Sequence, residues 1–220
     1  MKRGPKPSHK VHIRWSQKFA YAIGLLVSDG CLSKDGRHIV LTSKDKEQLM
    51  AFNECLGLTE KICEKYSGSG NVSCYVQFSD VVFYKFLLQI GLTPAKSKTI
   101  SAVHIPKKYF FHFLRGYFDG DGCSYSYHDS IWRNSYRFYV SFASGSEKYV
   151  VWLRNRLMEC VGLKGSINRK KGSSNVQLKY AKREAVILVK KMYYRNSVCL
   201  ERKRAKILDS LKVIRHMSEW

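Results

Sequence analysis

Apolar and polar residues recur along the chain with two different periods, which predict an alternation of helices and strands. Apolar residues three and four positions apart predict helices over residues 17–28, 46–56, 80–90, 107–119, 147–161, 183–193 and 198–214. Strict alternation predicts strands over residues 38–42, 72–78, 137–142 and 175–180, which we place in β-hairpins. Each strand has one apolar and one polar side, as in antiparallel sheets that are solvated on one face.

The order of these elements repeats once, and part of the sequence repeats with it. Residues 22–31 (AIGLLVSDGC) align without gaps with residues 114–123 (LRGYFDGDGC). Residues 54–58 and 159–163 then correspond, followed by 69–72 and 173–176 in the same order. The alignment pairs Gly24 with Gly116, Asp29 with Asp121, Gly30 with Gly122 and Cys31 with Cys123. The chain is therefore interpreted as a tandem duplication.

The predicted fold class is α+β, with two αββαββα halves related by a pseudo-twofold axis. The predicted organisation is a basic N-terminal tail (1–15), a first half (16–94), a linker (95–105), a second half (106–194) and a C-terminal helix (195–220). Each half carries an Asp-Gly pair just after its first helix. A single Asp-Gly pair could be an ordinary turn, but its presence in both halves favours a shared role.

Asp29 and Asp121 lie where the helix dipole is negative, so a carboxylate there is unfavourable unless a cation compensates it. Gly24 and Gly116 allow the two helices to pack closely, which would bring both carboxylates together. Two converging carboxylates raise each other's pKa unless divalent cations neutralise them. Hard oxygen ligands suit Mg²⁺. We expect two or more Mg²⁺ ions, with Mn²⁺ able to substitute.

The net charge of the chain indicates which kind of partner it binds. The chain has 39 Lys and Arg against 17 Asp and Glu, a net charge of 39 − 17 = +22. No acidic residue occurs between positions 81 and 118 or between 160 and 183. A folded protein of this charge is expected to bind a polyanion, with nucleic acid as the first candidate. Paired carboxylates with Mg²⁺ in such a protein are suited to phosphodiester hydrolysis. No apolar run approaches the length of a membrane span.

Polar side chains on the strands and basic loops are the candidate nucleic-acid contacts. Arg, Lys, Gln and Asn can recognise base edges in the major groove, whereas basic loops more often contact phosphates. For any one of these residues, a merely solvated surface is the alternative. The candidates are Lys34, Arg37, Ser73, Tyr75, Gln77, Arg133, Arg137, Tyr139, Arg169, Lys170, Lys171, Asn175, Gln177 and Lys179.

The seven cysteines include no C-x-x-C pair, so a zinc site is not expected. Their odd number, without any secretory signal, indicates reduced thiols in an intracellular protein. We expect them to be small buried residues in packing positions.

Residues 23–30 and 114–122 resemble the paired motifs of single-chain LAGLIDADG homing endonucleases, and the resemblance extends over about residues 16–194. It implies that the motif helices form the interface between the halves and that the two sheets form a DNA-binding saddle. It also implies that Asp29 and Asp121 are metal ligands, assisted by the backbone carbonyls of Ser28 and Gly120. An earlier motif Asp is present as Asp119 but replaced by Val27 in the first copy, which argues against a catalytic role for Asp119.

The resemblance implies auxiliary residues as well. A polar or basic residue after the first hairpin would be Ser43 or Lys44, whereas Ser144 and Gly145 offer no charge in the second half. A lysine after the last helix of each half would be Lys96 or Lys98, and Lys203. For each lysine, an ordinary surface position is the alternative.

The sequence thus predicts a monomeric, site-specific, Mg²⁺-dependent endonuclease that makes a double-strand break in a long asymmetric DNA target during the homing of a mobile intron. Double-stranded DNA is the expected partner, without a membrane or a protein partner. Alternatives on the same fold are an RNA maturase and a non-catalytic nucleic-acid-binding regulator. Retention of both Asp residues argues against the regulator.

Overall fold

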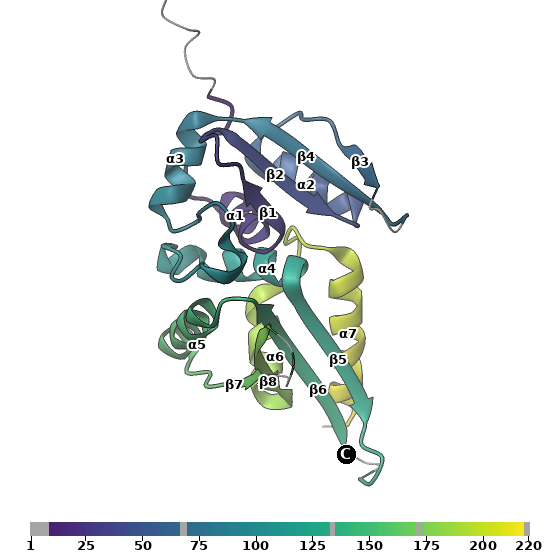
Figure 1. Cartoon of the computed structure of the whole chain (residues 1–220). Helices are drawn as coiled ribbons and strands as arrows, with labels where there is room; N and C mark the ends of the chain where they lie inside the picture. The colour runs from purple at the N-terminus through teal and green to yellow at the C-terminus, as the bar shows by residue number, and fades with distance from the viewer. Residues whose placement is uncertain (1–8, 67–69, 133–134, 170–171, 173, 218–220) are drawn as a thin grey trace, which may run out of the picture. The chain divides into compact units, whose positions relative to one another are not determined.

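The computed structural model describes residues 9–66, 70–132, 135–169, 172 and 174–217, which form two compact units (Figure 1). The first unit contains residues 1–96 and 103–120. The second contains residues 97–102 and 121–220. Each unit is built around one four-stranded antiparallel sheet with helices on its inner face.

The first unit begins with the motif helix and continues through its sheet. In chain order its elements are α1 (Gln17–Asp29), β1 (Gly30–Leu32), β2 (His38–Ser43), α2 (Lys46–Leu56), β3 (Cys63–Tyr66), β4 (Val72–Ser79) and α3 (Val81–Gln89). The short 3-10 helix η1 (Lys96–Lys98) follows α3, and η2 (Lys107–Tyr109) precedes α4 (Phe110–Asp121), which belongs to this unit up to Gly120. The strands lie in the order β1-β2-β4-β3.

Alternation along β2 and β4 forms the core of this unit. Ile39 pairs with Phe78 and Leu41 with Val76, and all four side chains are buried. Helices α1, α2 and α3 cover this inner face of the sheet. Ser16 caps α1, since its hydroxyl accepts the Phe19 amide proton at 3.0 Å.

The segment before α1 is fixed by a buried carboxylate. Asp80 is fully buried and its Oδ1 accepts the Phe83 amide proton at 2.9 Å, which caps α3. Its Oδ2 accepts the amide protons of Lys10 and Val11 at 2.8 and 2.9 Å. Residues 9–15 of the predicted basic tail are therefore packed on the first unit. Residues 1–8 lie outside the described part of the chain.

The second unit repeats the same order and adds one helix. Its elements are β5 (Gly122–His128), β6 (Tyr136–Ser144), α5 (Glu147–Val161), β7 (Ser166–Arg169), β8 (Val176–Ala181), α6 (Lys182–Met192) and α7 (Glu201–His216). The strand order β5-β6-β8-β7 matches that of the first sheet. The α+β prediction with two antiparallel sheets is confirmed.

Helix α7 lies alongside β5, as Figure 1 shows, and contacts β5 and β6. Ile207 and Ser210 form its buried side, and the Ser210 hydroxyl lies 3.0 Å from that of Ser126. No helix among the described residues is long and apolar enough to cross a membrane.

Element boundaries agree with the sequence predictions to within two residues, except at the starts of two helices. The predicted helix over 107–119 begins as a 3-10 turn after Pro106, and α4 itself starts at Phe110. The predicted last helix begins at Glu201, three residues later than expected. The compact units also differ from the sequence repeats, because α4 packs with α1 in the first unit.

Candidate active site and nucleic-acid interface

Helices α1 and α4 meet through their glycines with backbone against backbone. A Cβ atom added at Gly24 would lie 2.1 Å from the Phe113 carbonyl oxygen and 2.6 Å from the Tyr117 nitrogen. One added at Gly116 would lie 2.0 Å from the Tyr21 carbonyl oxygen. No side chain fits at either position, so the glycines permit this approach. This contact fixes α4 up to Gly120 on the first motif helix.

The carboxylate of Asp29 lies at the end of α1, half-buried, against the backbone of the second motif. A Cβ atom added at Gly120 would lie 2.3 Å from Asp29 Oδ2 and 2.0 Å from the Ser28 hydroxyl. Asp121 follows Gly120 directly in the chain and is exposed. The absence of a side chain at Gly120 therefore allows the Ser28 and Asp29 side chains to pack against its backbone. Convergence of Asp29 with Asp121 stays a prediction.

In each unit a lysine side chain donates a hydrogen bond to the glycine that follows the motif Asp, Gly30 or Gly122. Lys96 Nζ donates to the Gly30 carbonyl oxygen at 2.6 Å and to that of Ser28 at 3.3 Å, and the side chain is buried. In the second unit Lys203 Nζ donates to the Gly122 carbonyl oxygen at 2.7 Å. Gly30 and Gly122 are aligned residues, so both ammonium groups occupy equivalent places. Each supplies positive charge at a helix C-terminus, where the dipole is negative.

The other auxiliary candidates lie elsewhere. Lys98 is exposed, two residues beyond Lys96 in η1. Lys44 is exposed after β2, and the preceding Ser43 hydroxyl donates to Gln48 Oε1 at 2.7 Å. Spacing alone did not separate Lys96 from Lys98. The contact with Gly30 distinguishes them.

Asp119 is buried inside the helix pair. The Tyr21 hydroxyl donates to Asp119 Oδ2 at 2.8 Å, which joins α1 to α4. Arg115 is also buried, and its guanidinium carbon lies 5.5 Å from the Tyr21 ring centre.

Burial of the His112 ring lowers its pKa, and the positive charge of Arg115 lowers it further. Sequence reasoning missed Arg115, although a lone basic residue within an apolar helix is a recognisable signal.

The donor set at each motif end consists of hard oxygen atoms. Asp29 with the Ser28 carbonyl, and Asp121 with the Gly120 carbonyl, offer a carboxylate and a backbone oxygen each, as Mg²⁺ sites commonly do. Among the described residues, no cluster of three or more His, Cys, Asp or Glu side chains could hold a metal ion. The half-buried Asp29 carboxylate packs closely against the Gly120 backbone, which holds it at the motif end. These residues therefore fit a magnesium ion that keeps several of its water ligands.

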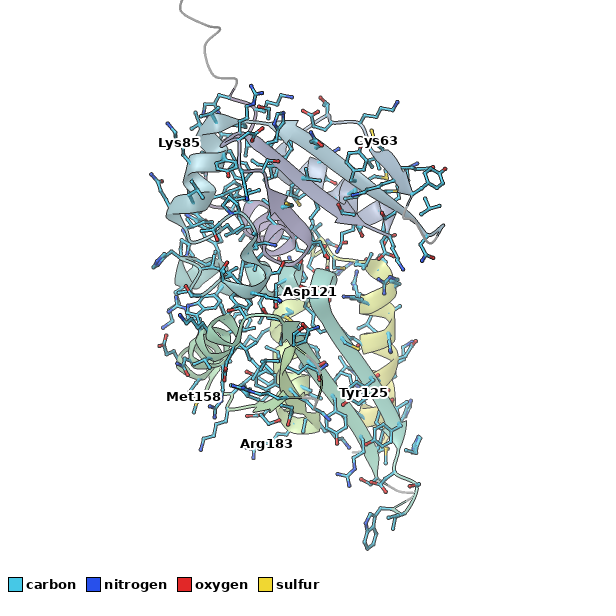
Figure 2. All side chains as sticks on the ribbon, in the orientation of Figure 1. Cys63, Lys85, Asp121, Tyr125, Met158 and Arg183 are labelled. Carbon is cyan, nitrogen blue, oxygen red and sulfur yellow. The ribbon has the colours of Figure 1, made fainter. Side chains whose placement is uncertain are left out.

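The outer face of the second sheet carries stacked tyrosines and a cation, and Tyr125 of this group is labelled in Figure 2. The Tyr125 and Tyr139 rings stack with centres 5.1 Å apart, and Tyr127 stacks on Tyr139 at 6.2 Å. Lys179 Nζ lies 3.9 Å from the Tyr139 ring centre and 5.3 Å from that of Tyr125. A hydrogen bond with Tyr125 raises the pKa of Lys179, which keeps it charged. The structure thus places two predicted contact residues, Tyr139 and Lys179, side by side.

The outer face of the first sheet includes both an acidic and a basic residue, Glu64 and Lys65. It bears a hollow of about 540 Å³ lined by Cys31, Val40, Thr42, Glu64, Lys65, Tyr75 and Gln77. Tyr75 and Gln77 were predicted contacts, and Ser73 lies near them, its hydroxyl 3.5 Å from the Lys65 carbonyl oxygen. Val40 and Thr42 were missed, although alternation along β2 places them on this face.

Several predicted basic contacts are paired with acids at the surface. Arg37 Nε lies 3.6 Å from Asp35, Arg137 donates to Asp129 at 3.0 Å, and Arg169 pairs with Glu147. Exposed pairs of this kind contribute little and can be exchanged for phosphate contacts. Lys34, Asn175 and Gln177 are exposed. Arg133, Lys170 and Lys171 lie outside the described residues.

The expectation of buried cysteines is wrong for most of the seven. Cys55 is buried, and burial raises the pKa of its thiol to about 12. Cys31 and Cys123 are exposed because each follows the motif glycine by one residue on a strand, where side chains alternate between faces. The other four are half-buried, and all seven are free thiols.

Comparison with known proteins shows which sequence model and which solved folds the chain resembles. Residues 16–91 match the sequence model of the LAGLIDADG-like domain, and no curated protein matches the chain in sequence. Similar solved structures include the homing endonuclease I-WcaI bound to its DNA recognition sequence, with 14% identity, a TM-score of 0.63 and 94% of this chain and 95% of that chain covered.

Two further structures share the fold. The N-terminal LAGLIDADG domain of DUF199/WhiA has 15% identity and a TM-score of 0.54, with 84% of this chain and 85% of that chain covered. The homing endonuclease I-DmoI in complex with DNA and Mn has 14% identity and a TM-score of 0.52, with 80% and 96% covered. The predicted resemblance is confirmed: residues 16–91 match the LAGLIDADG-like domain model, and the described part of the chain has the two-repeat LAGLIDADG fold.

Proposed function

We propose that the protein is a site-specific DNA endonuclease that makes a double-strand break by Mg²⁺-dependent phosphodiester hydrolysis, the activity used in the homing of a mobile intron. The observation that supports this most directly is the repeated motif end. Asp29 is half-buried beside Gly120, with Lys96 hydrogen-bonded to the Gly30 carbonyl. The second unit repeats the lysine contact, from Lys203 to the Gly122 carbonyl, next to an exposed Asp121. Similar folds that bind DNA, one of them with Mn, agree with this assignment.

In this proposal each motif serves one DNA strand. Asp29 and Asp121 hold the metal, assisted by the carbonyl oxygens of Ser28 and Gly120. Bound Mg²⁺ supplies a Lewis acid that lowers the pKa of water and offsets the charge that develops on the phosphate. The ammonium groups of Lys96 and Lys203 bind the carbonyl oxygen of the glycine that follows each Asp. They would add positive charge near the scissile phosphate.

The two sheets bind the DNA through faces of different chemistry. The outer face of the first sheet carries Thr42, Tyr75 and Gln77, whereas that of the second carries stacked tyrosines and Lys179. Different faces would recognise different base sequences, so a single chain would bind an asymmetric target as a monomer, without a protein or membrane partner.

The experiment that tests the proposal is a selection of cleaved sequences from a randomised duplex library with Mg²⁺, and with Mn²⁺ as a substitute. Recovery of one long, asymmetric sequence cut on both strands is expected, with no cutting in EDTA. Binding of a duplex without any cutting in either metal would instead support a non-catalytic regulator. Preferential binding of structured RNA would support an RNA maturase.

Lys96→Met is expected to lower cleavage of one DNA strand about a hundredfold, the usual effect of removing one charge-stabilising donor. The same plasmid should then accumulate as a nicked circle, because the other centre remains intact. The measurement is a time course of nicked and linear product, together with a melting temperature. Lys98→Met is the matched control, since Lys98 is exposed in the same short helix. Loss of cleavage in Lys98→Met alone would transfer the role to Lys98.

DNA affinity is expected to fall steeply with salt, because Lys and Arg side chains that contact phosphates release counterions. With a net charge of +22, we expect about six or more phosphate contacts. The slope of log K against log salt should then be on the order of −5 or steeper. The measurement is fluorescence anisotropy of a labelled selected duplex between low and moderate KCl. A flat dependence would argue against a nucleic-acid partner.

A further inference from the structure

The turn between β5 and β6 presents two large apolar side chains to solvent. Ile131 is 81% exposed and Trp132 is 69% exposed. Apolar side chains of this size, side by side at the end of a hairpin, gain no stability from the fold. Exposed aromatic and aliphatic residues on one turn are typical of a contact surface.

Hydrogen bonds fix the backbone at Ile131 and Trp132. Asp129 Oδ1 accepts the amide protons of Ile131 and Trp132 at 3.0 and 3.1 Å. The Asp129 amide donates to the Ser135 carbonyl oxygen at 2.8 Å, and the Ser135 amide donates to the Trp132 carbonyl oxygen at 2.7 Å. Backbone amide donors, followed by the Arg137 side chain, lower the pKa of Asp129, so the carboxylate stays ionised. The backbone at Trp132 is therefore ordered before binding, and only the indole side chain has to be ordered on binding.

The apolar turn joins β5 to β6, two strands whose outer face carries the tyrosine cluster. Tyr127 pairs across the ladder with Arg137, and Tyr125 pairs with Tyr139, which lies against Lys179. The outer face therefore carries a cation beside two tyrosines and an exposed Arg137, and Trp132 lies in the turn just beyond the last strand pair. Asp129 is the acid within the turn, and Arg137 neutralises it at 3.0 Å.

We propose that Trp132, supported by Ile131, stacks on a base at the flank of the DNA target, beyond the base pairs covered by the strands. This rests on the proposed function, and it adds a contact site that the strand faces do not include. Two exposed side chains form a patch far smaller than the surface of about 1,200–2,000 Å² that a stable protein interface buries. In a duplex the faces of the bases are already stacked, so the indole would insert at a base step that it partly unstacks, as the apolar wedges of other DNA-binding proteins do. The cations of the same unit would contact the phosphates.

The test compares Trp132→Ala with Trp132→Phe on a duplex selected by the wild-type protein from the randomised library. We expect Trp132→Ala to weaken binding about tenfold, as loss of one base–aromatic stack does, and Trp132→Phe to retain most of the affinity. The salt slope should be the same in both variants, because no phosphate contact is lost. Met158→Ala, an exposed apolar residue on α5 (Figure 2), is the matched control and should leave affinity unchanged.

Fluorescence supplies an independent reading. Indole emission should be quenched when the duplex binds to the wild-type protein, and this change should be absent in Trp132→Phe. Equal affinity of Trp132→Ala and wild type, or unchanged quenching in Trp132→Phe, would overturn the stacking contact. So would a concentration-dependent dimer of the free protein that Trp132→Ala abolishes without any effect on DNA. If the wild type itself bound no duplex, the proposed function would fail, and this outcome is separate from the others.

Discussion

Asp29→Asn and Asp121→Asn should each abolish double-strand cleavage while DNA affinity stays close to that of the wild type. Asn has the shape of Asp but lacks the negative charge that holds a divalent cation, and a metal contributes several kcal/mol to the transition state. We therefore expect each variant to cut one strand at least about a hundredfold more slowly. The measurement is conversion of supercoiled plasmid to nicked and linear forms, with gel-shift affinity measured in parallel.

The matched control for these variants is Asp209→Asn. Asp209 is exposed on α7 and pairs with Lys212 at 3.1 Å, away from the motif ends of its own unit. It should cleave both strands at the wild-type rate. Normal linearisation by Asp29→Asn or Asp121→Asn would remove that residue from the metal site.

Gly116→Leu should lower both the melting temperature and the cleavage rate, although Gly116 has no side chain that could contact DNA or metal. Its added Cβ would lie 2.0 Å from the Tyr21 carbonyl oxygen, so α1 and α4 must separate. Overpacking against backbone should lower stability by roughly 3 kcal/mol or more, which lowers Tm on the order of 10 °C. A displacement of about 1 Å at the motif end can lower the rate on the order of a hundredfold.

The experiment measures melting temperature beside the cleavage rate at saturating Mg²⁺, at a temperature where each variant is folded. Gly24→Leu is expected to behave in the same way, because its Cβ meets the Phe113 carbonyl oxygen at 2.1 Å. Gly57→Ala is the control: Gly57 ends α2 at a φ of 67° with open space around it, so Ala should lower stability and leave cleavage unchanged. If Gly116→Leu changed neither quantity, close helix packing could not be what positions the motif ends.

The sequence alone determined the elements and their repetition, because these depend on local chemistry. Periodic apolar residues predicted α5 over 147–161 and α2 over 46–56 with the boundaries that the structure has. Alternation predicted β2, β4, β6 and β8, since a half-buried strand must alternate. The duplicated Asp-Gly pointed to both motif ends because a carboxylate at a helix C-terminus is unfavourable without a compensating charge.

Tertiary structure decided the features that depend on residues distant in the chain. The choice of Lys96 over Lys98 rests on a hydrogen bond to Gly30, which lies 66 residues earlier. Burial of Asp119 depends on Tyr21, 98 residues away, and the exposure of Cys31 and Cys123 depends on which side of each sheet the helices cover. The exposure of Trp132 also depends on tertiary structure. A large apolar side chain is usually at least partly buried, and only the packed fold shows that no element among the described residues covers it. Hydrophobic pattern specifies which residues can be inside, whereas contacts between distant segments decide which of the remaining polar and apolar groups meet.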